Sequence, residues 1–517
     1  MKVRTLFNTL KYLKPIQFFY RIKNKFSPKG KRLFRNVSFR TTDSFIDCLH
    51  NDTEYLKRFA TNGDRIVILN QSVDLDYRDL SKYSPLVRFN IEYFEYAIVW
   101  AQKGITFDHL KTKWDEYVDA DLPLKSYVIS LQIPNMITAM DIYGIHDQSI
   151  YDELYSRYKW LLKHQEKHLL ANHFFENLKA IVIASFVFGE DSIHKKYVKK
   201  LLKECKEEIL DDGVHFELSQ MYHKIVLEDL LLVRKICGIT CFDKYIESML
   251  AAMYSIEYGF DRTPLFNDSG DNVAKSSRSL IKACKNILGT NPEKQNSFSQ
   301  SGYYKIDKGN ISLLIDAGKV GPDYNPGHAH CDCLSFELCI NGEPVLVNSG
   351  TYQYQGEKRS FFRSTSAHNT LMVSGREQSE MWGEHRVGRR IKVAKGSVKD
   401  DVFSGSCRNQ FNEVFNRTIS LVDGVFSVLD CTNTQKNGEK VTSFLHLSPK
   451  YTLEDGFIVG PKAKYKLELL GCSVRTISSF YSDQFGKIEN DQCLVFEWLT
   501  DDRQHGYNIS LNNKEIN

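Results

Sequence analysis

Residues 321–338 read GPDYNPGHAHCDCLSFEL and change from a Pro/Gly loop to an alternating apolar run. His328 and His330 lie two positions apart at that change. On an extended backbone such residues point to the same side, so both imidazoles are expected to face one way at the mouth of a strand. The same-parity positions that follow can be buried: Leu334, Phe336, Leu338 and Ile340. Two co-facial histidines indicate catalysis or metal binding. The alternative is a pair of loop histidines bonded to backbone.

N-terminal to this stretch, apolar residues recur every three or four positions from about residue 44 to 287. Examples are FNIEYFEYAIVWAQ at 89–102 and LKAIVIASFVFG at 178–189. This period predicts a succession of helices joined by short loops. The polar segment at 291–301, NPEKQNSFSQS, has no period and is typical of a linker.

After Gly302 the period becomes two, in short β-branched and aromatic segments such as ISLLIDAG, LSFELCI and RTISLVDGVFSVLD. Asn341-Gly342 between two such runs predicts a hairpin. Strands without intervening helices favour an antiparallel sandwich. We therefore predict an α+β chain in three parts: a basic segment at 1–42, a helical domain at 43–295 and a β-sandwich at 302–517.

Composition agrees with a globular protein of two domains. The chain has 517 residues, 42% of them hydrophobic and 26% charged, too many for one ordinary core. No apolar run is long enough to cross a bilayer. The twelve cysteines are scattered without a CxxC pair, which predicts reduced thiols and a cytoplasmic location. The 12% aromatic content suits a protein that stacks sugar rings, or simply an aromatic-rich core.

The first 42 residues contain no Asp or Glu but twelve Lys or Arg. Val3, Leu6, Leu10 and Leu13 recur at helical spacing, and no secretory signal pattern is present. A basic amphipathic helix of this kind can lie on an anionic membrane surface. The alternative is a solvated cap on the first domain.

Two groups of polar residues in the helical half stand out. The sequence NHFFEN brings Asn172, His173 and Glu176 onto neighbouring faces of a helix. About fifty residues later, HFELSQMYH follows a glycine turn and contains Tyr222. Each group alone is a weak signal, because an Asn-His pair is usually capping or surface and a helical Tyr is usually core.

A third group follows the hairpin, in VNSGTYQY at 347–354 and RSTSAHNTLMV at 363–373. The hairpin folds Asn348 back towards the histidine pair, and His368 precedes a further strand. An oxygen donor that converges with His330 and His368 is typical of a metal site.

Taken in this order, PGHAHCDCLSFEL, NSGTYQY and RSTSAHNTLMV resemble the heparinase II/III and alginate lyase families of polysaccharide lyases. The resemblance covers the chain from roughly residue 60 onward. It implies an (α/α) toroid packed on an antiparallel β-sandwich, with the active cleft between them. By the same resemblance Tyr222 is the catalytic acid, with a second role as base as the alternative, and His328 is the base on the other side of the sugar. Asn172 and His173 hold the substrate carboxylate. The remaining implied roles are substrate binding by Glu176, Arg363 and Tyr352, and structural zinc binding by His330, Asn348 and His368.

One position departs from the family pattern, which has Asp where this chain has Asn348. A neutral amide oxygen is a poorer zinc ligand than a carboxylate. We therefore expect either weaker zinc binding or a hairpin held by hydrogen bonds alone, and no organic cofactor. Cys331 and Cys333 are poor substitutes, because their parity points them to the opposite face.

The leading hypothesis is a lyase that cleaves a uronic-acid-containing polysaccharide or oligosaccharide by β-elimination, with no nucleic-acid partner. Removing the proton beside a uronate carboxylate requires donors that stabilise the extra charge, which Asn172 and His173 can supply. His328 suits a base at neutral pH, and Tyr222 suits an acid for a departing alkoxide. Leaderless relatives linked to capsule or O-antigen assembly suggest action at the inner membrane face.

Two alternatives remain open. A glycoside hydrolase needs paired carboxylates, for which the candidates are Asp211, Asp212, Glu217, Asp268 and Asp271. A non-catalytic glycan-binding protein is the other, with Asn348 as a sign of decay.

Overall fold

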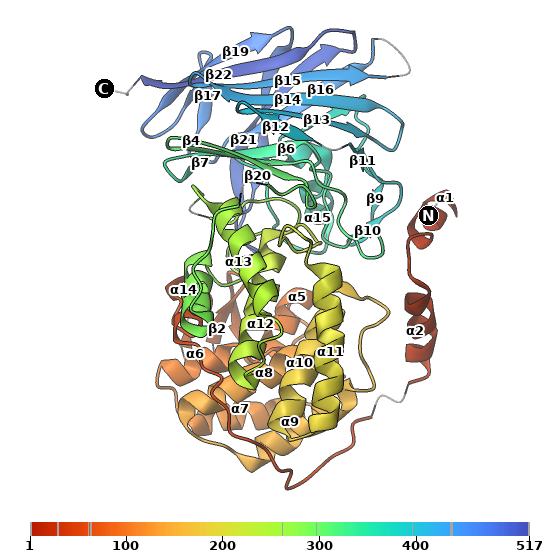
Figure 1. Cartoon of the computed structure of the whole chain (residues 1–517), viewed down its shortest axis with the longest axis vertical. Coiled ribbons are helices and arrows are strands. Elements are labelled where there is room, and N and C mark those ends of the chain that lie inside the picture. The colour runs from red at the N-terminus through yellow and green to blue at the C-terminus, as the bar shows by residue number, and fades with distance from the viewer. Residues whose placement is uncertain are drawn as a thin grey trace.

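The computed structural model describes residues 3–27, 30–59, 61–62, 65–260, 262–295, 297–394, 396–434 and 438–514. Helices fill the N-terminal part and antiparallel sheets fill the C-terminal part, stacked one on the other (Figure 1). The predicted fold class is confirmed. Within the described residues the helical part also holds a small sheet, formed by β1 (Thr61–Asn62), β2 (Arg65–Ile68) and β3 (Gln71–Asp74).

The helices have the following bounds: α1 Val3–Leu10, α2 Pro15–Lys25, α3 Asp47–His50, α4 Thr53–Arg58, α5 Pro85–Glu92, α6 Tyr96–Gln102, α7 Phe107–Asp119, α8 Ser126–Tyr143, α9 Gln148–Leu161, α10 Ala171–Val187, α11 Asp191–Glu208, α12 Gln220–Cys237, α13 Asp243–Glu257, α14 Ser277–Leu288 and α15 Glu357–Phe362. A short 3₁₀ turn covers Thr365–Ala367.

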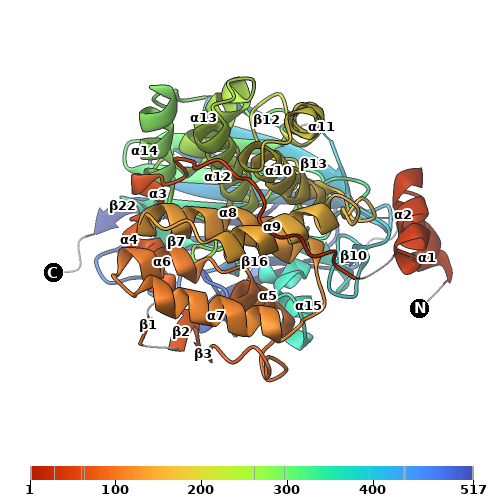
Figure 2. The same ribbon diagram turned by 90° about the horizontal axis from the view of Figure 1, so that it is seen from below.

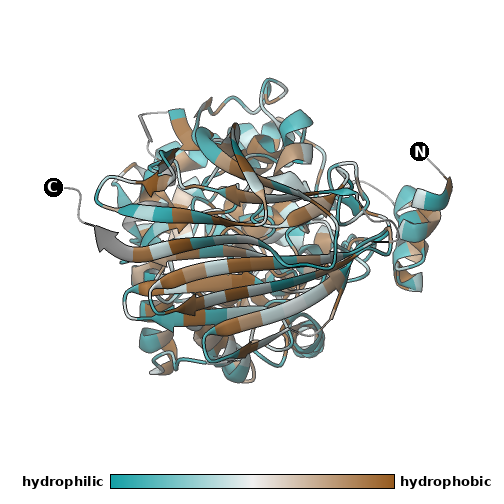
Figure 3. Cartoon of the chain, turned by 90° about the horizontal axis from the view of Figure 1, so that it is seen from above, coloured by the Kyte–Doolittle hydropathy of each residue, from teal (hydrophilic) through white to brown (hydrophobic). Residues whose placement is uncertain are grey.

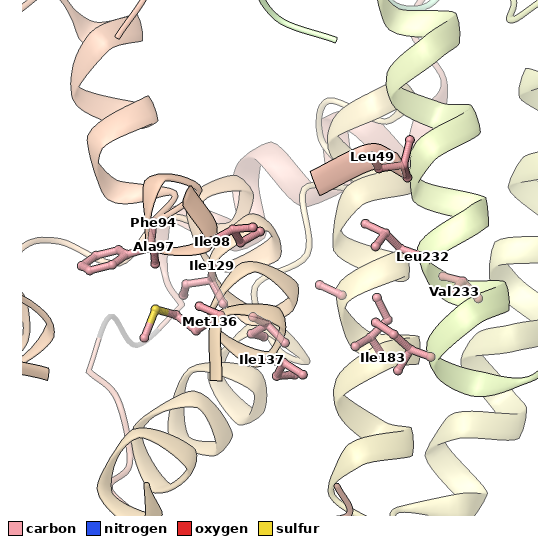
Figure 4. Packing of buried hydrophobic residues seen from close by; sticks show 14 of the residues in the cluster. Leu49, Phe94, Ala97, Ile98, Ile129, Met136, Ile137, Ile183, Leu232 and Val233 are labelled. Atoms are coloured by element: carbon pink, nitrogen blue, oxygen red, sulfur yellow. The ribbon is translucent and has the colours of Figure 1, made fainter. Parts of the chain in front are cut away.

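Inner and outer helices alternate along the helical domain. Nearly every residue of α10 is buried, and its sequence is apolar on most sides, as expected of a helix surrounded by others. The following helix, α11, buries one stripe only, formed by Tyr197, Leu201, Cys205 and Glu208. Helices α8, α10 and α12 are thus the inner members, covered by α9, α11 and α13 (Figure 2). Their aliphatic side chains, among them Ile137, Ile183 and Leu232, interlock in one core (Figure 4).

The strands have the following bounds: β1 Thr61–Asn62, β2 Arg65–Ile68, β3 Gln71–Asp74, β4 Tyr303–Lys308, β5 Ile311–Asp316, β6 Ser335–Ile340, β7 Glu343–Leu346, β8 Leu371–Val373, β9 Met381–Trp382, β10 Arg386–Val387, β11 Lys392–Val393, β12 Ser397–Lys399, β13 Val402–Arg408, β14 Val414–Val422, β15 Val425–Asn433, β16 Lys440–His446, β17 Thr452–Glu454, β18 Phe457–Val459, β19 Lys464–Leu470, β20 Ser473–Tyr481, β21 Glu489–Leu499 and β22 His505–Lys514.

The strands form a sandwich. One layer is a 9-stranded sheet of order β11-β13-β14-β15-β22-β19-β18-β17, with β12 beside β13, and it is the layer farther from the helices (Figure 3). Two 4-stranded sheets, β4-β5-β6-β7 and β20-β21-β16-β8, form the layer that faces the helical domain. Phe336 of β6 packs against Phe426 of β15, with ring centroids 5.2 Å apart, so one core joins the layers.

Strand β6 is buried along its whole length because it has a different partner on each face. Phe336, Leu338 and Ile340 enter the sandwich core as the alternation predicts. Cys339 faces the helical domain and packs with residues such as Ile256 of α13. The predicted hairpin is confirmed: Asn341 and Gly342 join β6 to β7 with φ angles of 53° and 78°, as a two-residue type I′ turn requires.

Helices α1 and α2 lie apart from the other helices, along one side of the molecule (Figures 1 and 2). Their polar contacts reach both domains. Among the described residues, no helix is both long and apolar enough to span a bilayer.

Candidate active site

The histidine pair converges on a buried carboxylate of the helical domain. His328 Nδ1 lies 2.9 Å from Asp268 Oδ2, and His330 Nε2 lies 2.8 Å from Asp268 Oδ1. The expectation of a strand at this point was wrong, because β6 begins only at Ser335. Leu334 has a φ of 61°, so the backbone turns before the strand begins. The two imidazoles therefore face one group through a loop rather than through strand parity.

Asp268 is held ionised by its neighbours. Arg359 donates to both carboxylate oxygens, with Nη2 2.8 Å from Oδ2. Burial alone would raise the pKa of the Asp268 carboxyl, but Arg359 and the hydrogen bonds from His328 and His330 hold that pKa well below its usual value. An ionised Asp268 only accepts hydrogen bonds, so His328 donates from Nδ1 and keeps the Nε2 lone pair free. That tautomer suits a base.

Tyr222 meets His328 because the start of α12 is fixed to the Asp268 loop. Ser219 caps the helix by accepting from the Tyr222 backbone N–H, and its hydroxyl donates to the Asp268 carbonyl at 2.6 Å. The Tyr222 and His328 ring centroids lie 4.0 Å apart. No sugar ring fits between them at that separation. The phenol and imidazole are neighbours here, whereas we had expected them on opposite sides of a sugar.

A second phenol completes this group. Tyr354 lies 2.9 Å from Tyr222, hydroxyl to hydroxyl, and its ring is 5.8 Å from that of His328. Burial raises the pKa of Tyr222, although the hydrogen bond with Tyr354 acts against the rise. Both phenols are therefore neutral at physiological pH, and Tyr222 holds a proton that it can donate.

Asn172 and His173 occupy the first turn of α10, after two residues in strained conformations. Leu170 and Ala171 have φ angles of 62° and 50°, which is rare for residues with a side chain and typical of functional sites. The Asn172 Oδ1 atom is buried without a hydrogen-bond partner among the described residues. Burial disfavours the charged form of His173, but Glu166, 3.2 Å from Nδ1, raises its pKa above 6.5. A histidine with a raised pKa and an amide are thus neighbours in the first turn of α10.

Glu217 lies between the group formed by Tyr222 and His328 and the pair formed by Asn172 and His173. Burial raises the pKa of its carboxyl, while His328, His173 and the backbone N–H of Asn172 act against that rise. Both α10 and α12 begin next to it, so the positive ends of two helix dipoles meet in the same region. The region is well suited to an anion, such as a substrate carboxylate.

Three residues that were predicted to bind substrate have other contacts. Glu176 pairs with Lys179 at 2.5 Å in the helical core. Arg363 is buried and donates to loop carbonyls, at 3.0 Å from Ala329 O and 2.9 Å from Glu384 O. Burial lowers the pKa of Arg363 to about 10. Tyr352 packs near Phe362, with ring centroids 6.3 Å apart. Tyr354, and not Tyr352, is the tyrosine of this motif that contacts Tyr222.

The predicted metal ligands His330 and His368 lie together, with His330 Nδ1 3.1 Å from His368 Nε2. His330 Nε2 faces the Asp268 carboxylate, and His368 Nδ1 faces the Ser364 carbonyl at 2.8 Å. Each ring therefore donates on its far side, so two lone pairs face each other. Burial lowers the pKa of His330 to about 4 and that of His368 to about 3, which disfavours a proton between them.

A cation between the two nitrogens would relieve the repulsion between their lone pairs. Two nitrogen ligands at about 2.0–2.1 Å from a tetrahedral Zn²⁺ lie about as far apart as His330 Nδ1 and His368 Nε2 do here. The third residue of this group is Asp332, whose carboxylate lies within 4.8 Å of both histidine nitrogens. The amide oxygen of Asn348, which we had expected as the third ligand, accepts from the Asn369 backbone N–H at 3.1 Å. The residues present fit zinc, with Asp332 in place of Asn348.

Sequence reasoning missed Tyr354, considered Arg359 only as one of several basic residues that suit an acidic polysaccharide, and treated Asp268 only as a hydrolase carboxylate. Tyr354 lies two positions from Tyr352 within the recognised motif, so the signal was present but assigned to the wrong residue. Arg359 and Asp268 are 91 positions apart in sequence, and no local pattern pairs them.

Comparison with known proteins identifies the family and the fold of this chain. Two family models, Heparinase II/III N-terminus and Heparinase II/III-like C-terminal, match residues 138–297 and 290–495. The chain belongs to the heparinase II/III family. Among its heparinase-type relatives, a heparin-sulfate lyase of Pedobacter heparinus is 24% identical over 209 residues, which are 34% of this chain and 31% of that protein. An alginate lyase of Stenotrophomonas maltophilia is 27% identical over 165 residues, which are 27% and 22% of the two chains. These matches span about a third of the relatives or less.

Solved structures show the same heparinase-type fold over nearly the whole chain. A heparinase III crystal structure aligns with a TM-score of 0.67 at 14% identity, covering 96% of this chain and 90% of the other. The heparan sulfate lyase of Pedobacter heparinus aligns with a TM-score of 0.57 at 15% identity, covering 97% and 88%. Both confirm the architecture of a helical domain followed by a β-sandwich.

Proposed function

We propose that this protein is a polysaccharide lyase that cleaves a uronic-acid-containing glycan by β-elimination. The observation that carries the proposal is the contact between Tyr222 and His328, a neutral phenol and an imidazole whose Nδ1 faces an ionised carboxylate. Acid–base chemistry of this kind contributes about 10²–10⁴-fold to a rate. The lyases named above share the family and support the reaction class.

The roles follow from the hydrogen bonds. His328 takes the C5 proton of the uronate at Nε2, because Nδ1 is engaged by Asp268. Tyr222 donates its phenolic proton to the departing O4 and has Tyr354 as a hydrogen-bond partner. Protonated His173 and the Asn172 side chain stabilise the charge that develops on the carboxylate when the C5 proton leaves.

Neighbouring acid and base suit a syn elimination, in which the proton and the departing oxygen leave from the same face of the sugar. In D-glucuronate and D-mannuronate the C5 hydrogen and O4 are cis, whereas in the C5 epimers L-iduronate and L-guluronate they are trans. The 4.0 Å contact between the two rings therefore favours the D-uronates. This replaces the expectation that acid and base flank the ring from opposite sides.

Zinc is part of the proposal. His330, His368 and Asp332 would hold it, and Zn²⁺ there would neutralise the facing lone pairs and fix the loop that carries His328. Elemental analysis of the purified protein should find about one zinc per chain, and His368→Gln should remove it. A protein without zinc whose thermal stability is insensitive to chelators contradicts this part.

The contacts of the hydrolase candidates do not favour the second hypothesis. Asp268 is fully engaged with Arg359 and the histidines, Asp212 accepts from the backbone at 300–301, and Asp271 accepts from the Thr263 backbone N–H at 2.9 Å. A non-catalytic glycan-binding protein would not need a base with a free Nε2 beside a protonated phenol. Glycoside hydrolysis and simple binding nevertheless remain measurable outcomes.

The test is the ultraviolet absorbance of the C4–C5 unsaturated product, measured with a panel of acidic polysaccharides. Tyr222→Phe and His328→Ala should abolish the absorbance while the protein stays folded. Reducing ends without absorbance identify a hydrolase, and glycan binding without either product identifies a binding protein.

The proposed location is the cytoplasmic side of a membrane where a surface polysaccharide such as capsule or O-antigen is assembled. The described cysteines are free thiols, as a reducing compartment predicts. Subcellular fractionation of the natural host tests this location.

A further inference from the structure

Helices α1 and α2 bury polar side chains and expose apolar ones. Helix α1 buries Thr5, Asn8 and Thr9 against the rest of the protein, and α2 buries only Gln17. An amphipathic helix of a globular protein normally buries its apolar stripe and exposes its polar one. In this pair the polar side chains face the protein, so packing within the chain leaves the apolar side uncovered.

The apolar side chains of the pair point to solvent. Of the 17 large hydrophobic side chains that the described part of the chain exposes, nine lie between Val3 and Leu33. On and next to the two helices the most exposed are Val3 at 84%, Phe7 at 67%, Phe19 at 61%, Ile22 at 63% and Phe26 at 83%. Phe19, Ile22 and Phe26 follow helical spacing and share one side of α2. A patch of this kind marks an interaction surface.

The charge around the patch is of one sign. Residues 3–27 contain no acidic residue, and exposed basic side chains border the apolar ones at Arg4, Lys11, Lys23 and Lys25. Phe and Ile beside Lys and Arg are the composition of helices that lie in the headgroup region of an anionic membrane. A second copy of this chain would instead bring the same positive charges face to face.

The buried side of the pair fixes its place on the molecule. In α1, Thr5 donates to Glu380 at 2.6 Å, and Trp382 donates to Thr9 at 3.0 Å, so this helix is bound to the β-domain. In α2, Gln17 donates to the Leu169 carbonyl at 3.2 Å, just before the strained turn at the start of α10. The pair thus bridges the two domains beside the active-site residues.

We infer that α1 and α2 are a membrane-docking surface, which places Val3, Phe7, Phe19, Ile22 and Phe26 in an anionic lipid surface. Their polar side holds both domains, so the docked protein presents the region of His173 and His328 at a fixed orientation to the bilayer. This inference goes beyond the predicted membrane contact of residues 1–42 in naming the inserted side chains, and it does not depend on the lyase chemistry.

The experiment is sedimentation of the full-length protein with vesicles of phosphatidylcholine alone, or of phosphatidylcholine with 30% phosphatidylglycerol. The protein should bind the anionic vesicles only. The variant Phe19→Ser/Ile22→Ser/Phe26→Ser should lose binding at least tenfold. Lys23→Gln/Lys25→Gln should weaken binding about fivefold per charge removed. The control Val422→Ser/Leu469→Ser/Leu499→Ser removes exposed apolar side chains elsewhere and should bind like the natural protein.

Circular dichroism and lyase activity on a soluble glycan, measured for every variant, separate lost docking from lost folding. The inference is overturned if the natural protein binds neither vesicle, or if the triple variant on α2 binds as well as the control. It is also overturned if light scattering finds a dimer that this triple variant dissociates, because a second copy would then cover the patch.

Discussion

Asp268→Asn is the sharpest test of the proposed site. Asp268 is fully buried, as is the guanidinium of Arg359 that it neutralises, and both histidines donate to it. Removing one partner of a buried ion pair costs about 3–5 kcal/mol. At roughly 2–4 °C per kcal/mol for a domain of this size, the melting temperature should fall by roughly 6–20 °C.

Asp268→Asn should also lower the activity of the protein that remains folded. An Asn side chain can offer an N–H to His328 Nδ1, which would move the imidazole proton to Nε2 and occupy the basic lone pair. In a serine protease the corresponding exchange lowers kcat about 10⁴-fold. We expect a loss of about 10³–10⁴-fold here, measured by product absorbance at a temperature where the variant is folded.

Asp430→Asn is the matched control. Asp430 is also fully buried, and Arg417 donates to both its oxygens at 2.8 Å, but it lies in the 9-stranded sheet. The melting temperature of the Asp430→Asn variant should fall by a similar amount, while the activity per folded molecule stays unchanged. If Asp268→Asn stays within tenfold of Asp430→Asn in activity, the assignment of His328 as a base oriented by Asp268 is refuted.

Three further outcomes are expected. Tyr354→Phe removes one hydrogen bond to Tyr222 and should lower kcat about tenfold with little change in KM; an unchanged kcat would exclude a role for that hydroxyl. The raised pKa of His173 means that its charge, and the stability from its pair with Glu166, are fully present below pH 6.5 and are lost as the pH rises through the raised value. Because Glu166→Gln removes the charge that raises the pKa of His173, the alkaline limb of kcat/KM should move to lower pH in this variant. A limb that does not move contradicts the role of protonated His173 in stabilising the substrate carboxylate. Arg363→Lys should lower the melting temperature, because Lys cannot reach the same carbonyls, without a change in KM that depends on substrate charge.

The parts of the fold that follow local patterns were predictable. Alternation placed Phe336 and Leu338 in the core, and Asn341-Gly342 specified its hairpin. The prediction that His328 and His330 face one way was right for the wrong reason, because a loop and not a strand turns both towards Asp268. Partners that depend on tertiary structure were beyond reach, since Asp268 meets Arg359 only after both domains have docked.

The errors share one physical cause. Arg363 is predicted to bind substrate because it is a charge inside a recognised motif, and Glu176 because it shares a helix face with Asn172, yet both are buried and neutralised or hydrogen-bonded within the protein. A sequence does not reveal whether a charged side chain faces a cleft or a backbone carbonyl. The same limit applies to Asn348, whose amide oxygen accepts from the Asn369 backbone N–H, while the carboxylate of Asp332 lies within 4.8 Å of both histidine nitrogens.

The bond between Thr5 and Glu380 spans 375 positions of sequence. At 5–20 residues per second, the ribosome needs on the order of tens of seconds to make the strand that anchors α1. Throughout that interval the first two helices have no β-domain to bind, while their phenylalanines and lysines are already outside the ribosome. Under the docking proposal, the nascent chain can therefore meet lipid before it meets its own C-terminal half, so the order of synthesis would favour assembly at a bilayer.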